Sequence, residues 1–240
     1  MRSKWKKNVA QRFDMGAKDY NDHSAVQSAV ADSLAKDLPD FASSPNILEI
    51  GCGTGALTRH LLDHYQGGYF HITDISAEMV EHARREFDIY ADIEWGVMDG
   101  EYPDIARRYD LIIGSMAFQW FEDIEGGLAR LRGLLKPNGV LLYAIPGAGS
   151  FREWHAALSG LGLSAGTLDF KAPSGVYREE ERSVQYDSTL TFLRDMKRIG
   201  AHTPRADYTA LNAADLRKAC RAVDADFNAT ITWHIVYGRL

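Results

Sequence analysis

The chain has 240 residues, of which 45% are hydrophobic, and a formal net charge of −6. This size suits one well-packed domain with appendages, and the negative charge argues against non-specific nucleic-acid binding, which needs excess lysine and arginine. Cys52 and Cys220 are too few for a disulfide framework and favour a reducing cytoplasm. The start of the chain lacks a signal-peptide core and no run could span a membrane, so we expect a protein that is neither exported nor membrane-bound.

Two helical segments precede the first predicted strand. Residues 4–20 form a short amphipathic stretch that ends in polar, turn-like sequence. A second helix is predicted where apolar side chains recur every four residues, at Val26, Val30, Leu34 and Leu38. We expect residues 1–45 to form an N-terminal helical cap. The sequence leaves open whether this cap closes over a ligand pocket or only packs on a sheet.

From residue 46 onward, predicted strands and helices alternate. The strands cover 46–50, 69–74, 92–98, 109–115 and 139–145, and the helices cover 54–65, 77–88 and 123–136. Alternation of this kind is typical of a mostly parallel sheet with helices on both faces and ligands at the carboxyl ends of the strands. We therefore predict a doubly wound α/β fold whose cofactor-binding core spans residues 46–146.

The loop after the first predicted strand carries Gly51, Gly53 and Gly55 at alternate positions. Glycine tolerates positive φ and has no Cβ, so such a loop can turn sharply and lie flat against a ligand. With Ala56 the spacing also satisfies the relaxed dinucleotide fingerprint. The loop therefore predicts a nucleotide-like ligand without identifying it.

Acidic residues at three predicted strand ends favour S-adenosylmethionine (SAM) over NAD. Glu49 would face the ammonium group of the ligand, Asp74 would reach both ribose hydroxyls, and Asp99 would reach the adenine edge. No second nucleotide-binding half follows the last predicted core strand, as a two-halved dinucleotide dehydrogenase would need. The predicted cofactor-binding residues are Glu49, Gly51, Gly53, Gly55, Asp74, Ile75, Met98, Asp99 and Ser115.

Residues 147–240 are expected to form the acceptor side of the molecule. We predict a helix over 151–161 and a mobile insertion over the glycine-rich remainder, in which the charge run 178–182 lies on a solvated surface. Beyond it we predict a strand over 183–187, helices over 190–199 and 213–223, and a closing strand over 228–237, which is rich in β-branched and aromatic residues.

The chain resembles the class I SAM-dependent methyltransferases over residues 46–145 and in the final strand, through the glycine loop and its acidic residues. More narrowly, it resembles the malonyl-acyl-carrier-protein O-methyltransferases of biotin synthesis. That resemblance rests on Val9-Ala10-x-x-Phe13 with Tyr20 and Gln27, Ala117-Phe118-Gln119-Trp120, Leu193-x-x-x-Lys197-x-Ile199-Gly200-Ala201, and Thr232-Trp233-His234-Ile235-Val236-Tyr237-Gly238. Phe118 and Trp233 depart from the leucine and tyrosine that are more usual there.

The resemblance implies a seven-stranded Rossmann-like sheet with an insertion after the fifth strand. It also implies an enzyme that methylates the free carboxylate of malonyl-acyl carrier protein or malonyl-CoA. Such a carboxylate, with a pKa of about 4, is already an anionic nucleophile at neutral pH and needs no general base. We expect hydrogen-bond donors to orient it instead, and predict Tyr20, Ser115, Gln119 and Arg152 for this role. Packing for Tyr20 and a surface position for Arg152 remain alternatives.

An acidic acyl carrier protein would need a basic face on this protein. Two clusters qualify, and the sequence does not choose between them: Arg194, Lys197, Arg198 and Arg205, or Arg217, Lys218 and Arg221. No metal site is predicted, because Leu61 follows His60 where a zincin helix has glutamate. The alternatives are a methyltransferase acting on a small-molecule carboxylate or hydroxyl, a non-catalytic SAM-binding assembly factor, and a dehydrogenase.

Overall fold

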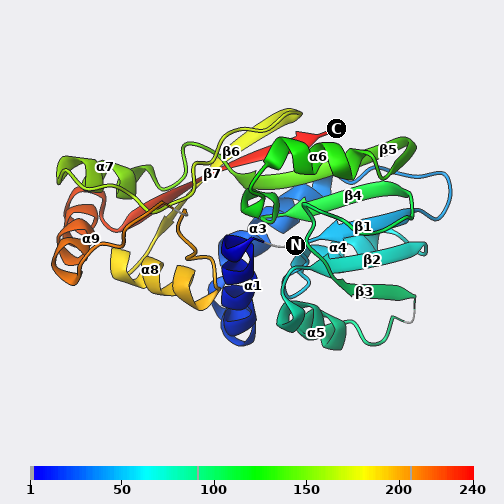
Figure 1. The fold of residues 1–240 in the computed structure, drawn as a ribbon, viewed down its shortest axis with the longest axis horizontal. Coiled ribbons are helices and arrows are strands. Elements are labelled where there is room, and N and C mark those ends of the chain that lie inside the picture. The colour runs from blue at the N-terminus through cyan, green and yellow to red at the C-terminus, as the bar shows by residue number, and fades with distance from the viewer. Residues whose placement is uncertain (1–2, 91, 206) are drawn as a thin grey trace.

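Seven strands form one sheet in the order β3-β2-β1-β4-β5-β7-β6 in the computed structural model, which describes residues 3–90, 92–205 and 207–240 (Figure 1). Strands β1 to β5 are parallel where they pair, and β7 runs antiparallel to both β5 and β6. The strands are β1 (Asn46–Ile50), β2 (Tyr69–Asp74), β3 (Ile93–Val97), β4 (Tyr109–Ser115), β5 (Leu135–Pro146), β6 (Val176–Gln185) and β7 (Thr230–Arg239). The predicted doubly wound, mostly parallel fold is confirmed.

The sheet is buried on both faces because the central strands are apolar at successive positions. Ile47 packs in one hydrophobic cluster with α3 (Ala25–Leu34) and α4 (Ala56–His64), whereas Leu48 packs in a second cluster with α6 (Ile124–Arg132). Successive residues of a strand point to opposite faces, so a run of apolar residues suits a strand covered on both sides.

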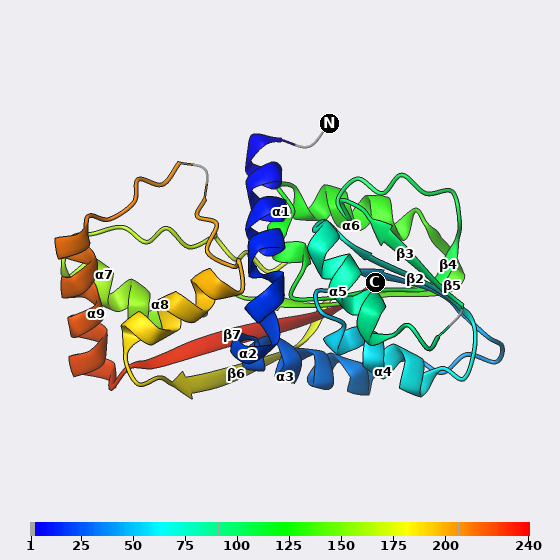
Figure 2. The same ribbon diagram turned by 90° about the horizontal axis from the view of Figure 1, so that it is seen from below.

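The helices after β5 gather around the first half of β7, away from the parallel strands (Figures 1 and 2). They are α7 (Arg152–Gly160), α8 (Thr189–Arg198) and α9 (Ala213–Phe227), while α5 (Ala77–Glu86) lies beside β2 and β3. Both views show α1 (Lys4–Gly16) between these two parts of the molecule, followed by the short α2 (Tyr20–His23). No helix in the described ranges is long and apolar enough to cross a bilayer.

The observed bounds of β5 and β6 differ from two predictions about the second half of the chain. Strand β5 begins at Leu135, before the turn signal Pro137-Asn138-Gly139, because Leu135 already pairs with Tyr109 ahead of a register irregularity. The charge run 178–182 lies within β6 rather than in an irregular insertion. Burial alternates along β6, so every second charged side chain is sheltered and paired.

The sheltered face of β6 is held by an ion-pair network. Arg178 pairs with Asp37 at 2.6 Å and lies over the ring of Tyr237, and Glu180 accepts hydrogen bonds from Tyr237 and Arg182, both at 2.6 Å. Asp37 follows α3, so these contacts attach the N-terminal helices to the far edge of the sheet. A run of charges can therefore form a strand when partners on its neighbours satisfy it.

Candidate functional site

The loop after β1 forms the floor of a cavity at the carboxyl ends of the parallel strands. Gly51 has φ +75°, and a Cβ there would lie 2.4 Å from the Cβ of Ala117, so this position requires glycine. The N–H groups of Gly51 and Cys52 both donate to the carbonyl oxygen of Thr73, at 2.8 and 3.0 Å. These bonds fix the loop against β2 and leave its open side toward the cavity.

This strand-end cavity collects most of the predicted cofactor residues. Glu49, Gly51, Gly53, Asp74, Ile75, Met98, Asp99 and Ser115 all line it. Gly55 is not part of the lining; it precedes α4 with φ +97°, and a Cβ there would meet the ring of Phe87 at 2.3 Å. Gly55 therefore shapes the start of the helix rather than the wall of the cavity.

Glu49 presents a buried carboxylate to the strand-end cavity. Its Oε2 accepts a hydrogen bond from the Thr58 hydroxyl at 2.7 Å, while its Oε1 has no partner among the described residues. Burial is the main cause that raises the pKa of Glu49 to about 8, and the nearby Asp74 adds to the effect. An unpaired carboxylate oxygen in this position fits a cationic group of a ligand.

Asp74, the last residue of β2, holds the glycine loop while facing the same cavity. One carboxylate oxygen accepts from the Gly53 N–H at 2.9 Å and the other from the Ser76 N–H at 2.8 Å. Burial raises the pKa of Asp74 to about 6, although these two N–H groups favour the ionised form. Each oxygen retains capacity for a further donor, as a pair of ribose hydroxyls would supply.

Asp99 belongs to a buried charge cluster that the sequence did not reveal. Lys6 of α1 places its ammonium 2.9 Å from both Asp99 and Glu101, and 4.9 Å from the ring centre of Phe121. Lys6 is 2% exposed and Glu101 is fully buried. The Oδ2 of Asp99 is buried without a partner among the described residues, so it is left to accept from a ligand.

A second, largely apolar cavity adjoins the first. Both cavities are lined by Phe13, Tyr20, Gln27, Met116 and Trp120, so they share a wall. Apart from Gln119 and Pro146, the rest of the apolar cavity comes from the chain after β5, including Phe151, Trp154, Phe192, Met196 and Trp233. The N-terminal helices therefore do more than pack on the sheet: they supply part of the wall of both cavities.

The polar groups predicted to orient an acceptor are divided between the two cavities. Tyr20 borders both, Ser115 lines the strand-end cavity, and Gln119 lines the apolar cavity. Gln119 Nε2 donates to the Met116 carbonyl oxygen at 2.7 Å, while Gln119 Oε1 and Ser115 Oγ are buried without partners within the described ranges. Burial, with Asp74 nearby, raises the pKa of Tyr20, so its hydroxyl stays protonated and can donate.

The apolar cavity carries no formal charge at neutral pH. Its lining, as far as the chain is described, includes no aspartate, glutamate, lysine or arginine. His202 is part of the wall, and burial together with Arg12 and Lys197 lowers its pKa to about 4, so its ring is neutral. An anionic group that enters this cavity therefore meets neutral donors only.

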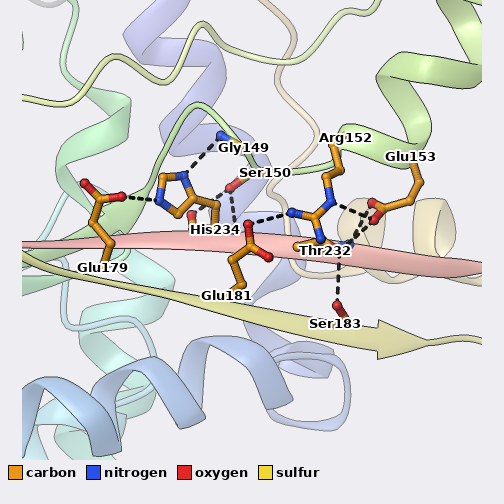
Figure 3. Close-up of polar contacts among 9 residues, drawn as sticks. All are labelled: Gly149, Ser150, Arg152, Glu153, Glu179, Glu181, Ser183, Thr232 and His234. Atoms are coloured by element: carbon orange, nitrogen blue, oxygen red, sulfur yellow. Dashed lines mark hydrogen bonds and ion pairs between the residues drawn. The ribbon is translucent and has the colours of Figure 1, made fainter.

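Arg152 lies outside both cavities. Its Nη1 binds Glu181 at 2.5 Å and its Nε lies 3.4 Å from Glu153 (Figure 3). Figure 3 shows the guanidinium between these carboxylates, beside β7 and β6. The predicted acceptor role for Arg152 receives no support from this position, because its charge is already paired at the surface.

These features fit SAM as the cofactor. The unpaired Oε1 of Glu49, the two oxygens of Asp74 and the unpaired Oδ2 of Asp99 lie around a loop that requires glycine at Gly51. Carboxylates suit an ammonium group, a ribose diol and an adenine amino group, in the order in which these strand ends are arranged. A doubly wound sheet with such a site defines a class I SAM-dependent methyltransferase.

Comparison with known proteins agrees with this class. A family model described as "Methyltransferase domain" matches residues 48–141. The YcgJ protein of Bacillus subtilis shares the fold, with a TM-score of 0.60 and 15% identity over 88% of this chain and 97% of that one. The N-methyltransferase NodS of Bradyrhizobium japonicum, solved with S-adenosyl-L-homocysteine, has a TM-score of 0.51 and 16% identity over 97% and 98% of the two chains.

Curated relatives narrow the class to a family. The malonyl-acyl-carrier-protein O-methyltransferase of Magnetococcus marinus is 37% identical over 92% of this chain and 88% of its own length. The biotin biosynthesis bifunctional protein BioCD of Bordetella avium is 38% identical over 97% of this chain and 52% of its own length. The chain belongs to the family of malonyl-acyl-carrier-protein O-methyltransferases.

Proposed function

We propose that this protein methylates the free carboxylate of a malonyl group carried on acyl carrier protein, as an early cytoplasmic step of biotin synthesis. The observation that carries the proposal is the shared wall of the two cavities, formed by Phe13, Tyr20, Gln27, Met116 and Trp120. A cofactor in the strand-end cavity and an acceptor in the apolar cavity would meet at this wall. Family membership supports malonyl-acyl carrier protein as the acceptor.

In this proposal, Glu49 binds the ammonium group of SAM, Asp74 binds the ribose hydroxyls and Asp99 binds the adenine edge. Gly51 and Gly53 let the loop approach the cofactor closely, and Ile75, Met98 and Ser115 complete the walls. When bound, SAM supplies an electrophilic methyl group on a positively charged sulfur. The task left to the side chains is to hold the acceptor in line with that group.

The acceptor carboxylate needs orientation rather than activation. With SAM bound, one carboxylate oxygen would take the methyl group and sulfur would keep the electron pair of the broken carbon–sulfur bond, so no side chain would need to accept a proton. Tyr20 borders both cavities and can donate to the other carboxylate oxygen, and Gln119 lies farther along the apolar wall. The ester product is neutral, which suits an apolar cavity better than the ionised substrate does.

An intact-mass assay with SAM and malonyl-loaded acyl carrier protein tests the function. We expect a mass gain of one methyl group on the malonyl carrier and none on an acetyl-loaded carrier, which lacks the free carboxylate. Malonyl-CoA run alongside compares the two carriers. Methylation of small free acids but of no thioester would contradict the proposal. SAM binding without transfer to any acceptor would instead favour a non-catalytic role.

Replacing Tyr20 by phenylalanine separates acceptor orientation from cofactor binding. Loss of one hydrogen bond to a charged acceptor should lower kcat by roughly tenfold, while the ring of Tyr20, 3.8 Å from where a Cβ on Gly53 would lie, remains in place. We therefore expect SAM affinity, measured by calorimetry, to change by less than about twofold. Turnover equal to that of the unchanged protein would leave Tyr20 with a packing role only.

The raised pKa of Glu49 makes SAM binding depend on pH. Because that pKa is about 8 in the free protein, most of the Glu49 carboxyl is protonated at pH 7. A bound ammonium group favours the ionised form, so binding at pH 7 should release about one proton. Calorimetry in buffers of different ionisation enthalpy measures this number, and Glu49→Gln should reduce it to about zero. Equal proton release by the two proteins would exclude Glu49 as the ammonium ligand.

A further inference from the structure

Only one of the two basic clusters borders the apolar cavity. Helix α8 contributes Phe192, Leu193 and Met196 to the lining, whereas the fully described α9 contributes no residue. Figures 1 and 2 both place α8 beside α1, with α9 at the outer end of the molecule. Arg194 and Lys197 are exposed, so the basic residues of α8 stand on the outside of the cavity wall.

Helix α8 carries more uncompensated positive charge than α9. Within the part of the chain that the structure describes, no ion pair joins Arg194 or Lys197 to an acidic side chain. Each helix has one paired cation: Arg198 lies 4.0 Å from Asp195 on α8, and Lys218 lies 3.1 Å from Asp215 on α9. Helix α8 carries three basic residues and one acidic residue, whereas α9 carries three of each. Helix α8 therefore has a net positive charge and α9 has none, so an acidic partner is attracted more strongly to α8.

Arg12 of α1 adds a third cation beside the apolar cavity, near Lys197 of α8. Its Nη1 donates to the carbonyl oxygen of His202 at 2.7 Å, and His202 lines the apolar cavity. The lowered pKa of His202, caused by burial and then by Arg12 and Lys197, agrees with both cations lying near its ring. We call Arg12, Arg194 and Lys197 the α8 edge; two of its members, Arg12 and Lys197, lie near His202 of the lining segment 201–204.

We propose that the α8 edge is the surface on which an acidic acyl carrier protein docks. The proposal rests on the proposed function and names the surface that delivers its substrate. Charge complementarity identifies the occupant: uncompensated cations beside an uncharged, apolar cavity suit an acidic protein that carries an acyl group on a long thioester arm. The carrier would sit against α8 and α1 while its arm passes residues 201–204 into the apolar cavity.

Two charge-reversed variants test this surface directly. Arg194→Glu/Lys197→Glu changes the α8 edge, and Arg217→Glu/Arg221→Glu changes α9 and alters the net charge by the same amount. The affinity of each protein for fluorescently labelled malonyl-acyl carrier protein is measured by anisotropy at low and moderate salt. SAM binding, measured by calorimetry, checks that each variant is folded.

We expect the α8 variant to bind the carrier at least about tenfold more weakly and the α9 variant to change by less than about twofold. Binding to the unchanged protein should also weaken as salt rises. An equal loss in both variants, a loss confined to the α9 variant, or no carrier binding by the unchanged protein would overturn the proposal. If the carrier binds with the expected pattern but no methyl group is transferred, the docking surface stands and the proposed reaction fails.

Discussion

Asp74→Ala is expected to weaken SAM binding by about a hundredfold, which corresponds to about 2.7 kcal/mol. The carboxylate of Asp74 lines the strand-end cavity and also accepts from the N–H groups of Gly53 and Ser76. Truncation removes the proposed ribose contacts, and it also leaves two backbone donors without their acceptor, one of them in the glycine loop. Charge-assisted hydrogen bonds of this kind are the costly ones to lose.

Calorimetry of SAM binding measures the effect of Asp74→Ala, with Asp63→Ala as the matched control. Asp63 is an exposed residue of α4, outside both cavities, so its replacement should leave the dissociation constant within about twofold. Asp74→Asn keeps one acceptor for a backbone N–H, so its dissociation constant for SAM should lie between those of Asp74→Ala and Asp63→Ala. An unchanged dissociation constant for Asp74→Ala would show that the ribose is held elsewhere.

The cofactor side of the site could be predicted from sequence because its signals are local. Glu49 and Asp74 stand at the ends of β1 and β2, and both strands were predicted with the bounds that the structure gives them. In a parallel sheet the carboxyl ends of neighbouring strands meet at one edge. Strand prediction therefore also placed these two carboxylates, together with Asp99 after β3, around one cavity.

The sequence does not directly reveal the role of Lys6, because its partners lie far away in the chain. It is 93 positions from Asp99, and no local pattern announces such a contact. A signal was nevertheless present. Lys6 precedes Val9 and Phe13 by three and seven residues, so it stands on the apolar face of α1. A lysine on that face indicates a buried cation that needs acidic partners.

The surroundings of Arg152 could not be predicted from the sequence. Sequence patterning predicts a solvated surface for the charge run 178–182. In the structure this run forms β6, and its Glu181 binds Arg152. Period-two burial is hard to recognise when every position is charged, because the usual contrast between apolar and polar residues is absent. The run adopts a strand conformation because it pairs antiparallel with β7.

Lys6→Met is expected to lower the free energy of unfolding by about 3–5 kcal/mol. The methionine approximates the volume of the lysine stem but removes the ammonium group that lies 2.9 Å from both Asp99 and Glu101. Asp99 is 8% exposed and Glu101 is fully buried, so losing their common cation leaves negative charge that water solvates poorly. Urea unfolding followed by circular dichroism measures the change.

Lys7→Met is the control for this prediction, since Lys7 is the exposed neighbour of Lys6 in α1 and should change stability by less than about 0.5 kcal/mol. If the loss in Lys6→Met comes from unpaired charge, adding Asp99→Asn should restore part of it, because one of the two stranded carboxylates is then neutral. If it comes from packing alone, the double variant should be no more stable than Lys6→Met. Equal stability of the Lys6 and Lys7 variants would contradict the prediction. It would mean that the ion pairs of Lys6 with Asp99 and Glu101 only offset their own desolvation cost, and that Lys6 only fills space between α1 and the end of β3.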